Sequence, residues 1–179
     1  FNSDEGNSNK AGVPESNIFS AKEQQIVKDN EIYEKTALSL LNGTSVKKGY
    51  CLVLNCGEGE LVSELAEKSD LYIIGIEENV RKVKKAKEKL DKSGLYGKKV
   101  IVENWSINSL PEYFADLIVA GGLEKSGQLN HTPDEIFRVL KPGGGAACLR
   151  KSGLENGWSQ LNVKESELMN EDGDWVVFT

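Results

Sequence analysis

The chain has 179 residues, of which 39% are hydrophobic and 28% are charged, as is typical of one globular domain with a substantial core. Its formal net charge of −6 argues against a nucleic-acid partner and against an anionic membrane surface. No apolar run approaches the ~20 residues that a membrane helix requires. The composition therefore excludes a membrane-spanning protein and favours a globular one.

The cysteines and the first residue bear on location and context. Cys51, Cys56 and Cys148 fall in predicted strands or in a glycine turn, without a paired framework, so we expect reduced, buried thiols in a cytoplasmic protein. The chain begins with Phe1 rather than methionine, which predicts a processed chain or an excised domain. Other domains of a larger parent protein are therefore one class of candidate partner.

The predicted elements begin after a polar segment. Residues 1–17 are rich in Asn, Ser, Gly and acidic residues, and we expect a flexible arm there and a single α/β domain over residues 18–179. The capping box Ser20-Ala-Lys-Glu23 predicts a helix to about Leu41. Its apolar face would contain Ile26, Tyr33, Ala37 and Leu40.

Strands and helices then alternate. Apolar runs predict strands at residues 50–54, 71–76, 100–102, 115–120 and 146–150, and two closing strands meet at Glu171-Asp-Gly-Asp174. Helices follow the first two strands, a third begins at the Thr132-Pro-Asp-Glu135 box, and a short one lies within residues 154–161. This order predicts a mainly parallel seven-stranded sheet with an antiparallel C-terminal hairpin and helices on both faces.

A glycine turn and an acidic residue suggest a ligand. The turn Asn55-Cys-Gly-Glu-Gly59 directly follows the first strand, and Glu77 directly follows the second. Glycine lets the backbone approach a ligand closely, and a carboxylate at the next strand end can accept hydrogen bonds from ribose hydroxyls. These features predict a nucleoside-binding βαβ unit.

From Tyr50 onward the chain resembles the class I S-adenosylmethionine-dependent methyltransferases, which have a Rossmann-like α/β fold. Four segments carry the resemblance in the expected order: Leu54-Asn-Cys-Gly-Glu-Gly-Glu-Leu61, Gly75-Ile-Glu77, Ser109-Leu-Pro111 before Phe114-Ala-Asp-Leu-Ile-Val119, and Arg138-Val-Leu-Lys-Pro-Gly-Gly144. The resemblance implies methyl transfer from S-adenosylmethionine to an unidentified acceptor, with S-adenosylhomocysteine as product. A dinucleotide-binding protein is disfavoured because the bulky Val62 occupies the position of its third small residue.

The resemblance also implies a set of cofactor-binding residues. The methionine part would lie on the turn, the ribose on the acid after the second strand, and the adenine between the residues that follow it and those after the third strand. In that order the implied residues are Asn55, Cys56, Gly57 and Gly59; Glu77; Glu78 and Asn79; and Trp105, Ser106 and Ile107. No catalytic residue is indicated.

Three positions depart from the family pattern. Val53 and Ser106 replace acidic residues, and Asn55 replaces the first glycine of the turn. Asparagine tolerates left-handed backbone, and a serine hydroxyl accepts from an amine more weakly than a carboxylate does. An alternative function is therefore a degenerate, non-catalytic module of a larger protein, and some segments are similar to methyltransferase-like domains fused to quinoprotein-type β-propellers.

Several residues have a structural interpretation beside the functional one. Glu78 could complement a helix dipole, Trp105 could fill the rim of the site, and Cys56 could be a thiolate or a packing residue. We interpret His131, the only histidine, as an exposed loop residue, and the basic run at residues 81–89 as a solvated helix face rather than an RNA contact. A metal site is not predicted.

Overall fold

The structure is a computed structural model that describes residues 21–120, 130–154, 158, 165–170 and 173–179. The predicted arm at residues 1–17 and the Ser20 cap lie outside these ranges. The elements in chain order are α1 (Ala21–Thr44), β1 (Lys48–Leu54), α2 (Glu60–Glu67), β2 (Asp70–Ile76), α3 (Val80–Lys92), β3 (Val100–Glu103), the 3-10 helix η1 (Ile107–Ser109), β4 (Leu117–Ala120), α4 (Pro133–Val139), β5 (Ala146–Arg150), the 3-10 helix η2 (Lys151–Gly153), β6 (Glu165–Asn170) and β7 (Gly173–Phe178).

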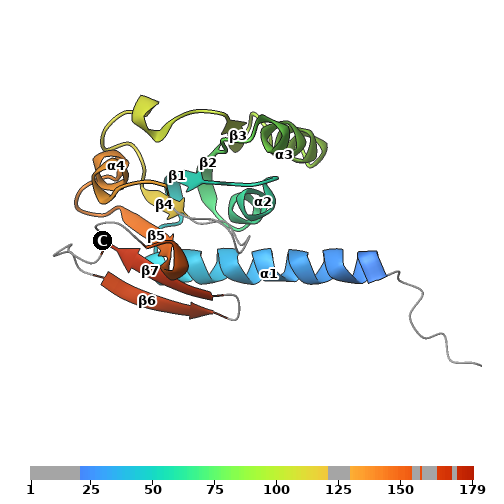
Figure 1. Ribbon diagram of the computed structural model, residues 1–179, viewed down its shortest axis with the longest axis horizontal. Helices are drawn as coiled ribbons and strands as arrows, with labels where there is room; N and C mark the ends of the chain where they lie inside the picture. Colours follow the sequence, from blue (N-terminus) through green and yellow to red (C-terminus); the bar gives the residue numbers. More distant parts are fainter. Residues whose placement is uncertain (1–20, 121–129, 155–157, 159–164, 171–172) are drawn as a thin grey trace, which may run out of the picture.

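The strands form one seven-stranded sheet in the order β3-β2-β1-β4-β5-β7-β6 (Figure 1). Strands β1 to β5 are all parallel to their neighbours within this group, whereas β7 runs antiparallel to both β5 and β6. Asn170 lies opposite Gly173, so β6 and β7 form the closing hairpin that the Asp-Gly signal predicts. The predicted Rossmann-like fold is confirmed.

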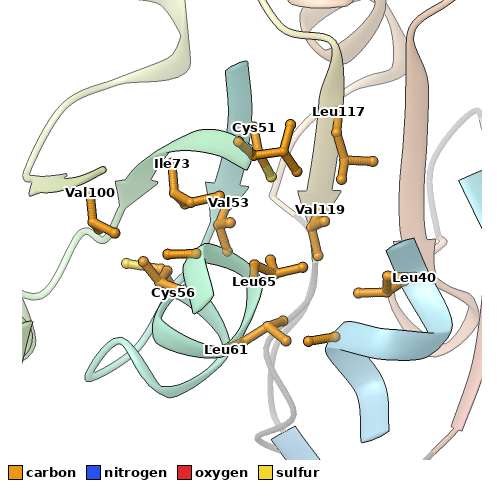
Figure 2. Close-up of a cluster of buried hydrophobic side chains, with 14 of the residues drawn as sticks. Leu40, Cys51, Val53, Cys56, Leu61, Leu65, Ile73, Val100, Leu117 and Val119 are labelled. Atoms are coloured by element: carbon orange, nitrogen blue, oxygen red, sulfur yellow. The ribbon is translucent and has the colours of Figure 1, made fainter. Parts of the chain in front are cut away.

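Helices α1, α2 and α3 pack on one face of the sheet. Their buried side chains form one cluster with the side chains that β1 to β5 and β7 direct to that face. Figure 2 shows Val53 and Val119 of the sheet facing Leu61 and Leu65 of α2, with Leu40 of α1 beside them. The alternation of apolar side chains along β1 therefore supplies the contacts that hold α2 behind the glycine turn.

The opposite face is covered more sparsely. Among the described residues, α4 and η1 cover it, together with the buried Trp158. The connection between β3 and β4 contains the single turn η1, and Tyr50 and Tyr72 are about half exposed nearby. The prediction of helices on both faces is confirmed, with one α-helix on this side in the described part of the chain.

Helix α1 departs from the prediction at its N-terminal half. Ala37 and Leu40 are buried, but Ile26, which the pattern placed on the same face, is 49% exposed. Figure 1 shows why, because the N-terminal half of α1 extends past the α/β body. The predicted short helix within residues 154–161 falls largely outside the described residues.

The sheet register brings three strand ends together. Leu54 pairs with Ile76, and Ile76 pairs with Glu103, so the connections after β1, β2 and β3 begin side by side. In parallel sheets ligands bind at this carboxyl edge. Within the described ranges, no helix is both long and apolar enough to cross a bilayer.

Candidate functional site

The glycine turn between β1 and α2 is built from left-handed backbone. Asn55, Gly57 and Gly59 have φ angles of 53°, 62° and 90°. The Cys56 amide donates to the Ile76 carbonyl at 3.1 Å, which ties the turn to the end of β2. Asparagine is among the few residues with a side chain that adopt this conformation at modest cost, so the turn keeps its shape without the family's first glycine.

The glycines around the turn serve two purposes. A β-carbon at Gly59 would lie 3.2 Å from Cβ of Ala86, and one at Gly75 would lie 2.9 Å from Sγ of Cys56, so both positions need glycine for close packing. A β-carbon at Gly57 would have no heavy atom within 4 Å. Gly57 therefore leaves open space above its backbone, as a turn that a ligand approaches requires.

Glu77 joins the turn to the start of α3. Its side chain is buried, with 8% of the residue exposed. Oε2 accepts from the Gly57 amide at 2.9 Å, and Oε1 accepts from the Asn79 amide at 2.9 Å. Each carboxylate oxygen has two lone pairs, so each keeps one acceptor position. The carboxylate is thus fixed beside the turn and can still accept two hydroxyl groups.

The two residues after Glu77 differ in their roles. Asn79 is the N-cap of α3, and its Oδ1 accepts from the Arg81 amide at 3.0 Å. Its side chain therefore caps the helix, a role that the sequence assignment to the adenine rim missed. The side chain of Glu78 is exposed at the same edge.

The third segment of the predicted site follows β3. Trp105 is 43% exposed, and Oγ of Ser106 accepts from the Asn108 amide at 3.2 Å as the N-cap of η1. Ile107 is 1% exposed and belongs to the core on the α4 side. Only the main chain of Ile107 could touch a ligand, whereas Trp105 and Ser106 are accessible.

Asn104 at the end of β3 was missed by sequence reasoning. Its Nδ2 donates to the Glu77 carbonyl at 2.9 Å and to the Glu78 carbonyl at 2.7 Å. The signal that could have found it is an amide side chain directly after a parallel strand, next to the strand that carries the acid.

Two residues singled out in the sequence, Val53 and Cys56, belong to the core. Val53 is 2% exposed and lies in the cluster beneath α2, where an acidic side chain would lack water. Burial, followed by the nearby Glu77 carboxylate, raises the pKa of the Cys56 thiol to about 12. Cys56 is therefore a packing residue, and its thiolate interpretation is wrong. Cys51 and Cys148 are likewise free and buried.

Lysines of α3 pair with acids in the turn and at the start of α2. Lys85 Nζ lies 2.6 Å from Glu58 Oε1, and Lys89 Nζ lies 3.2 Å from Glu60 Oε1. These ion pairs are solvent-exposed, and pairs of this kind contribute about 0–1 kcal/mol each. Part of the basic run therefore pairs with neighbouring carboxylates, as a solvated helix face does.

His131 lies directly before Thr132, the N-cap of α4. It is half-buried rather than exposed, and burial lowers the pKa of its imidazole. Its Nδ1 lies 3.9 Å from Oε2 of Glu135, whose carboxylate completes the predicted capping box with Thr132. Within the described residues, no group of three or more His, Cys, Asp or Glu side chains could hold a metal ion.

A groove of about 510 Å³ lies along α3 and reaches Glu58 of the glycine turn. It is lined by Glu58, Lys85, Glu88, Lys89, Lys92 and Ser93. No aromatic side chain is among these residues, and Lys85 and Lys89 are paired as described above. The groove therefore offers no aromatic platform for a nucleobase, and the residues predicted to bind the cofactor lie instead at the carboxyl edge of β1, β2 and β3.

Comparisons with known proteins identify the family of the chain. A family model described as "Methyltransferase domain" matches residues 47–175. No curated protein matches the chain in sequence.

Solved structures share the fold. A candidate S-adenosyl-L-methionine-dependent methyltransferase from Methanococcus maripaludis is 18% identical with a TM-score of 0.68, over 87% of this chain and 89% of that one. An S-adenosylmethionine-dependent methyltransferase from Aquifex aeolicus is 19% identical with a TM-score of 0.61, over 87% of this chain and 96% of that one. Coclaurine N-methyltransferase, solved with S-adenosylhomocysteine, is 16% identical with a TM-score of 0.53, over 67% of this chain and 35% of that one.

These descriptions support S-adenosylmethionine, the cofactor predicted from the sequence. At these identities the structural likeness shows the fold, whereas the family model spans most of the chain. The chain therefore belongs to the family of methyltransferase domains.

Proposed function

We propose that the carboxyl edge of β1, β2 and β3 binds S-adenosylmethionine and that the domain transfers its methyl group to an acceptor. The observation that carries the proposal is the Glu77 carboxylate, held 2.9 Å from the Gly57 amide beside a turn with open space above Gly57. A vicinal pair of ribose hydroxyls needs two acceptors on one rigid group, which this carboxylate supplies.

The methionine part would lie over the turn. Helix α2 begins at Glu60, and its N-cap is Gly59, which offers no side chain to cap the first amides. Helix N-termini favour anions, so a ligand carboxylate near Gly59 would be stabilised. The left-handed Asn55 and Gly57 shape the backbone on which the ligand chain would rest.

The adenine would lie between the segments after β2 and β3. Trp105 offers an exposed aromatic face for stacking, and the Ser106 hydroxyl lies on the next residue. Because Oγ of Ser106 already accepts from Asn108, it has one acceptor position left for the adenine amine. We expect binding of the base to be weaker than with a carboxylate at this position.

When bound, the cofactor supplies an electrophilic methyl group on a sulfonium. Transfer needs mainly alignment of the acceptor atom with that group, and a base only where the acceptor carries a proton. The chain's own contribution is to hold the ligand through Glu77 and the turn.

A non-catalytic module is the second candidate function. It is favoured by Ser106, whose hydroxyl caps η1 instead of presenting a carboxylate to the base. Under this alternative the site would retain its shape and lack affinity for the cofactor.

Calorimetric titration with S-adenosylmethionine and S-adenosylhomocysteine tests the proposal, with NAD as a control for dinucleotide binding. Binding of both sulfur ligands in the micromolar range, without binding of NAD, is the expected result. No heat and no thermal shift at millimolar ligand would overturn the proposal in favour of the module. An assay of labelled methyl transfer to a set of small molecules and peptides then tests whether the domain is catalytically active.

A further inference from the structure

We infer that Asn104 is a positioning residue that holds the nucleoside half of the site in its binding shape. This inference rests on the proposed function and adds a residue to it. It concerns the main chain of Glu77 and Glu78, which leads from β2 into α3.

The main chain here passes the end of the sheet. The Glu77 amide donates to the Glu103 carbonyl at 3.2 Å, and β3 ends at that residue. Beyond it, the carbonyls of Glu77 and Glu78 are bonded by Nδ2 of Asn104, at 2.9 Å and 2.7 Å. One side chain therefore extends the link between β2 and β3 by two residues.

The chemistry of the amide suits this task. A primary amide carries two hydrogens on one nitrogen, and here both are directed at main-chain carbonyls. Aspartate at position 104 would present only acceptors to the two carbonyls when ionised, so the two bonds would become repulsions. Asn104 itself is exposed; its bond to the Glu77 carbonyl is half-buried, and its bond to the Glu78 carbonyl is exposed.

The consequence reaches Glu77 through its neighbours. The carboxylate accepts from the Asn79 amide on one side and from the Gly57 amide on the other. If the carbonyls of residues 77 and 78 are released, the Asn79 amide loses its link to β3 and is held only from the side of α3. Asn104 therefore acts on ribose binding through Glu77 and needs no contact with the ligand.

The test compares Asn104→Ala and Asn104→Asp with Asn108→Ala. Asn108 is the matched control, since it is an exposed asparagine on the same connection whose Nδ2 bonds to Glu135 instead, at 2.9 Å. Each protein is titrated calorimetrically with S-adenosylhomocysteine and with adenosine, and its thermal unfolding is recorded. We expect both ligands to bind about ten-fold more weakly to Asn104→Ala, more weakly still to Asn104→Asp, and normally to Asn108→Ala.

A double-mutant cycle distinguishes an effect of Asn104 through Glu77 from a non-specific destabilisation of the site. If Asn104 acts through Glu77, the losses in affinity from Asn104→Ala and Glu77→Gln are less than additive. Unchanged affinity in both Asn104 variants, or fully additive losses, would overturn the inference while the proposed function stands. A wild-type protein that binds neither ligand would overturn both.

Discussion

The carboxylate of Glu77 and the backbone amide of Gly57 are joined by a hydrogen bond of 2.9 Å, although twenty positions separate them in the chain. The bond connects the end of β2 to the turn after β1. The group expected to hold the ribose therefore also fixes the turn expected to hold the rest of the cofactor. Ligand affinity and local stability should respond together when either partner changes.

Replacing Glu77 with glutamine should lower both the affinity for the ligand and the stability of the fold. One amide oxygen replaces two carboxylate oxygens, so an NH₂ group would face either the Gly57 or the Asn79 amide. Hydrogen bonds to charged groups contribute about 1.5–3 kcal/mol, so we expect a ten- to hundred-fold loss in affinity for S-adenosylhomocysteine and a lower melting temperature. Calorimetry and thermal unfolding measure the two effects. Glu112→Gln, at an exposed position, is the control, and an unchanged affinity in Glu77→Gln would refute the ribose assignment.

Gly57→Ala should separate binding from stability. Its left-handed φ of 62° costs an alanine about 1–2 kcal/mol, and its β-carbon would project into the open space of the site. Gly143→Ala is a matched control, because Gly143 has a φ of 74° and equally open surroundings in the turn before β5. We expect similar losses in urea stability from both variants and lost ligand binding from Gly57→Ala alone. Equal affinities in the two variants would place the ligand elsewhere.

Ser106→Asp should increase affinity. Aspartate is as good an N-cap as serine, so η1 is preserved, and a carboxylate beside the adenine amine makes a charge-assisted bond about twice as strong as a neutral one. We expect a several-fold lower Kd for S-adenosylhomocysteine. Tyr113→Asp, at an exposed position of the connection between β3 and β4, controls for the added charge. If both variants bind alike, Ser106 does not face the base.

Gly49→Ala should destabilise the fold without touching the site. Gly49 has a φ of 107°, and a β-carbon there would overlap Oδ2 of Asp116. That carboxylate accepts from the Tyr50 amide at 2.8 Å and from Lys141 at 2.8 Å. Its displacement would therefore break the hydrogen bond that links the residue before β4 to β1, and the ion pair with Lys141. Strain at such a site costs about 1–3 kcal/mol before these bonds are counted. Urea denaturation measures the loss, and Gly144→Ala, with open surroundings, should be near neutral.

The capping box of α4 predicts a pH dependence. The Thr132 amide lowers the pKa of the Glu135 carboxyl below its ordinary value of 4.5, and Asn108 adds to this effect. A lowered folded-state pKa contributes stability above the ordinary value, and this contribution is lost as the pH falls through the lowered value. The stability difference between wild type and Glu135→Gln should therefore be full at pH 7 and shrink below about pH 4.5. A difference that is constant from pH 7 to pH 3 would contradict this account.

The fold could be predicted from the sequence because its signals are local. The apolar strand at Leu52 and Leu54, the Thr132 box and the Asp-Gly turn each depend on a few adjacent residues, and each lies where it was predicted. The exposure of Ile26 could not be predicted, since helical periodicity says which residues share a face and not how far the body beneath them extends.

The candidate site could be proposed from the sequence for a related reason. Glycines and an acid at strand ends are visible in the chain, so the turn and Glu77 could be selected as candidates, and the structure places them side by side. The bonds of Asn104 and the capping role of Asn79 depend on how β2, β3 and α3 meet in space, which no short pattern encodes. The burial of Ile107 follows in the same way from the packing of α4 against η1.

The most direct test of the central claim is a nuclear magnetic resonance titration of the ¹⁵N-labelled protein with S-adenosylhomocysteine. The account predicts that amide shifts concentrate at Gly57, Gly59, Glu77, Glu78 and Ser106, around the carboxyl ends of β1, β2 and β3. Shifts confined to the charged groove at Glu88 and Lys92, or no shifts at millimolar ligand, would contradict it.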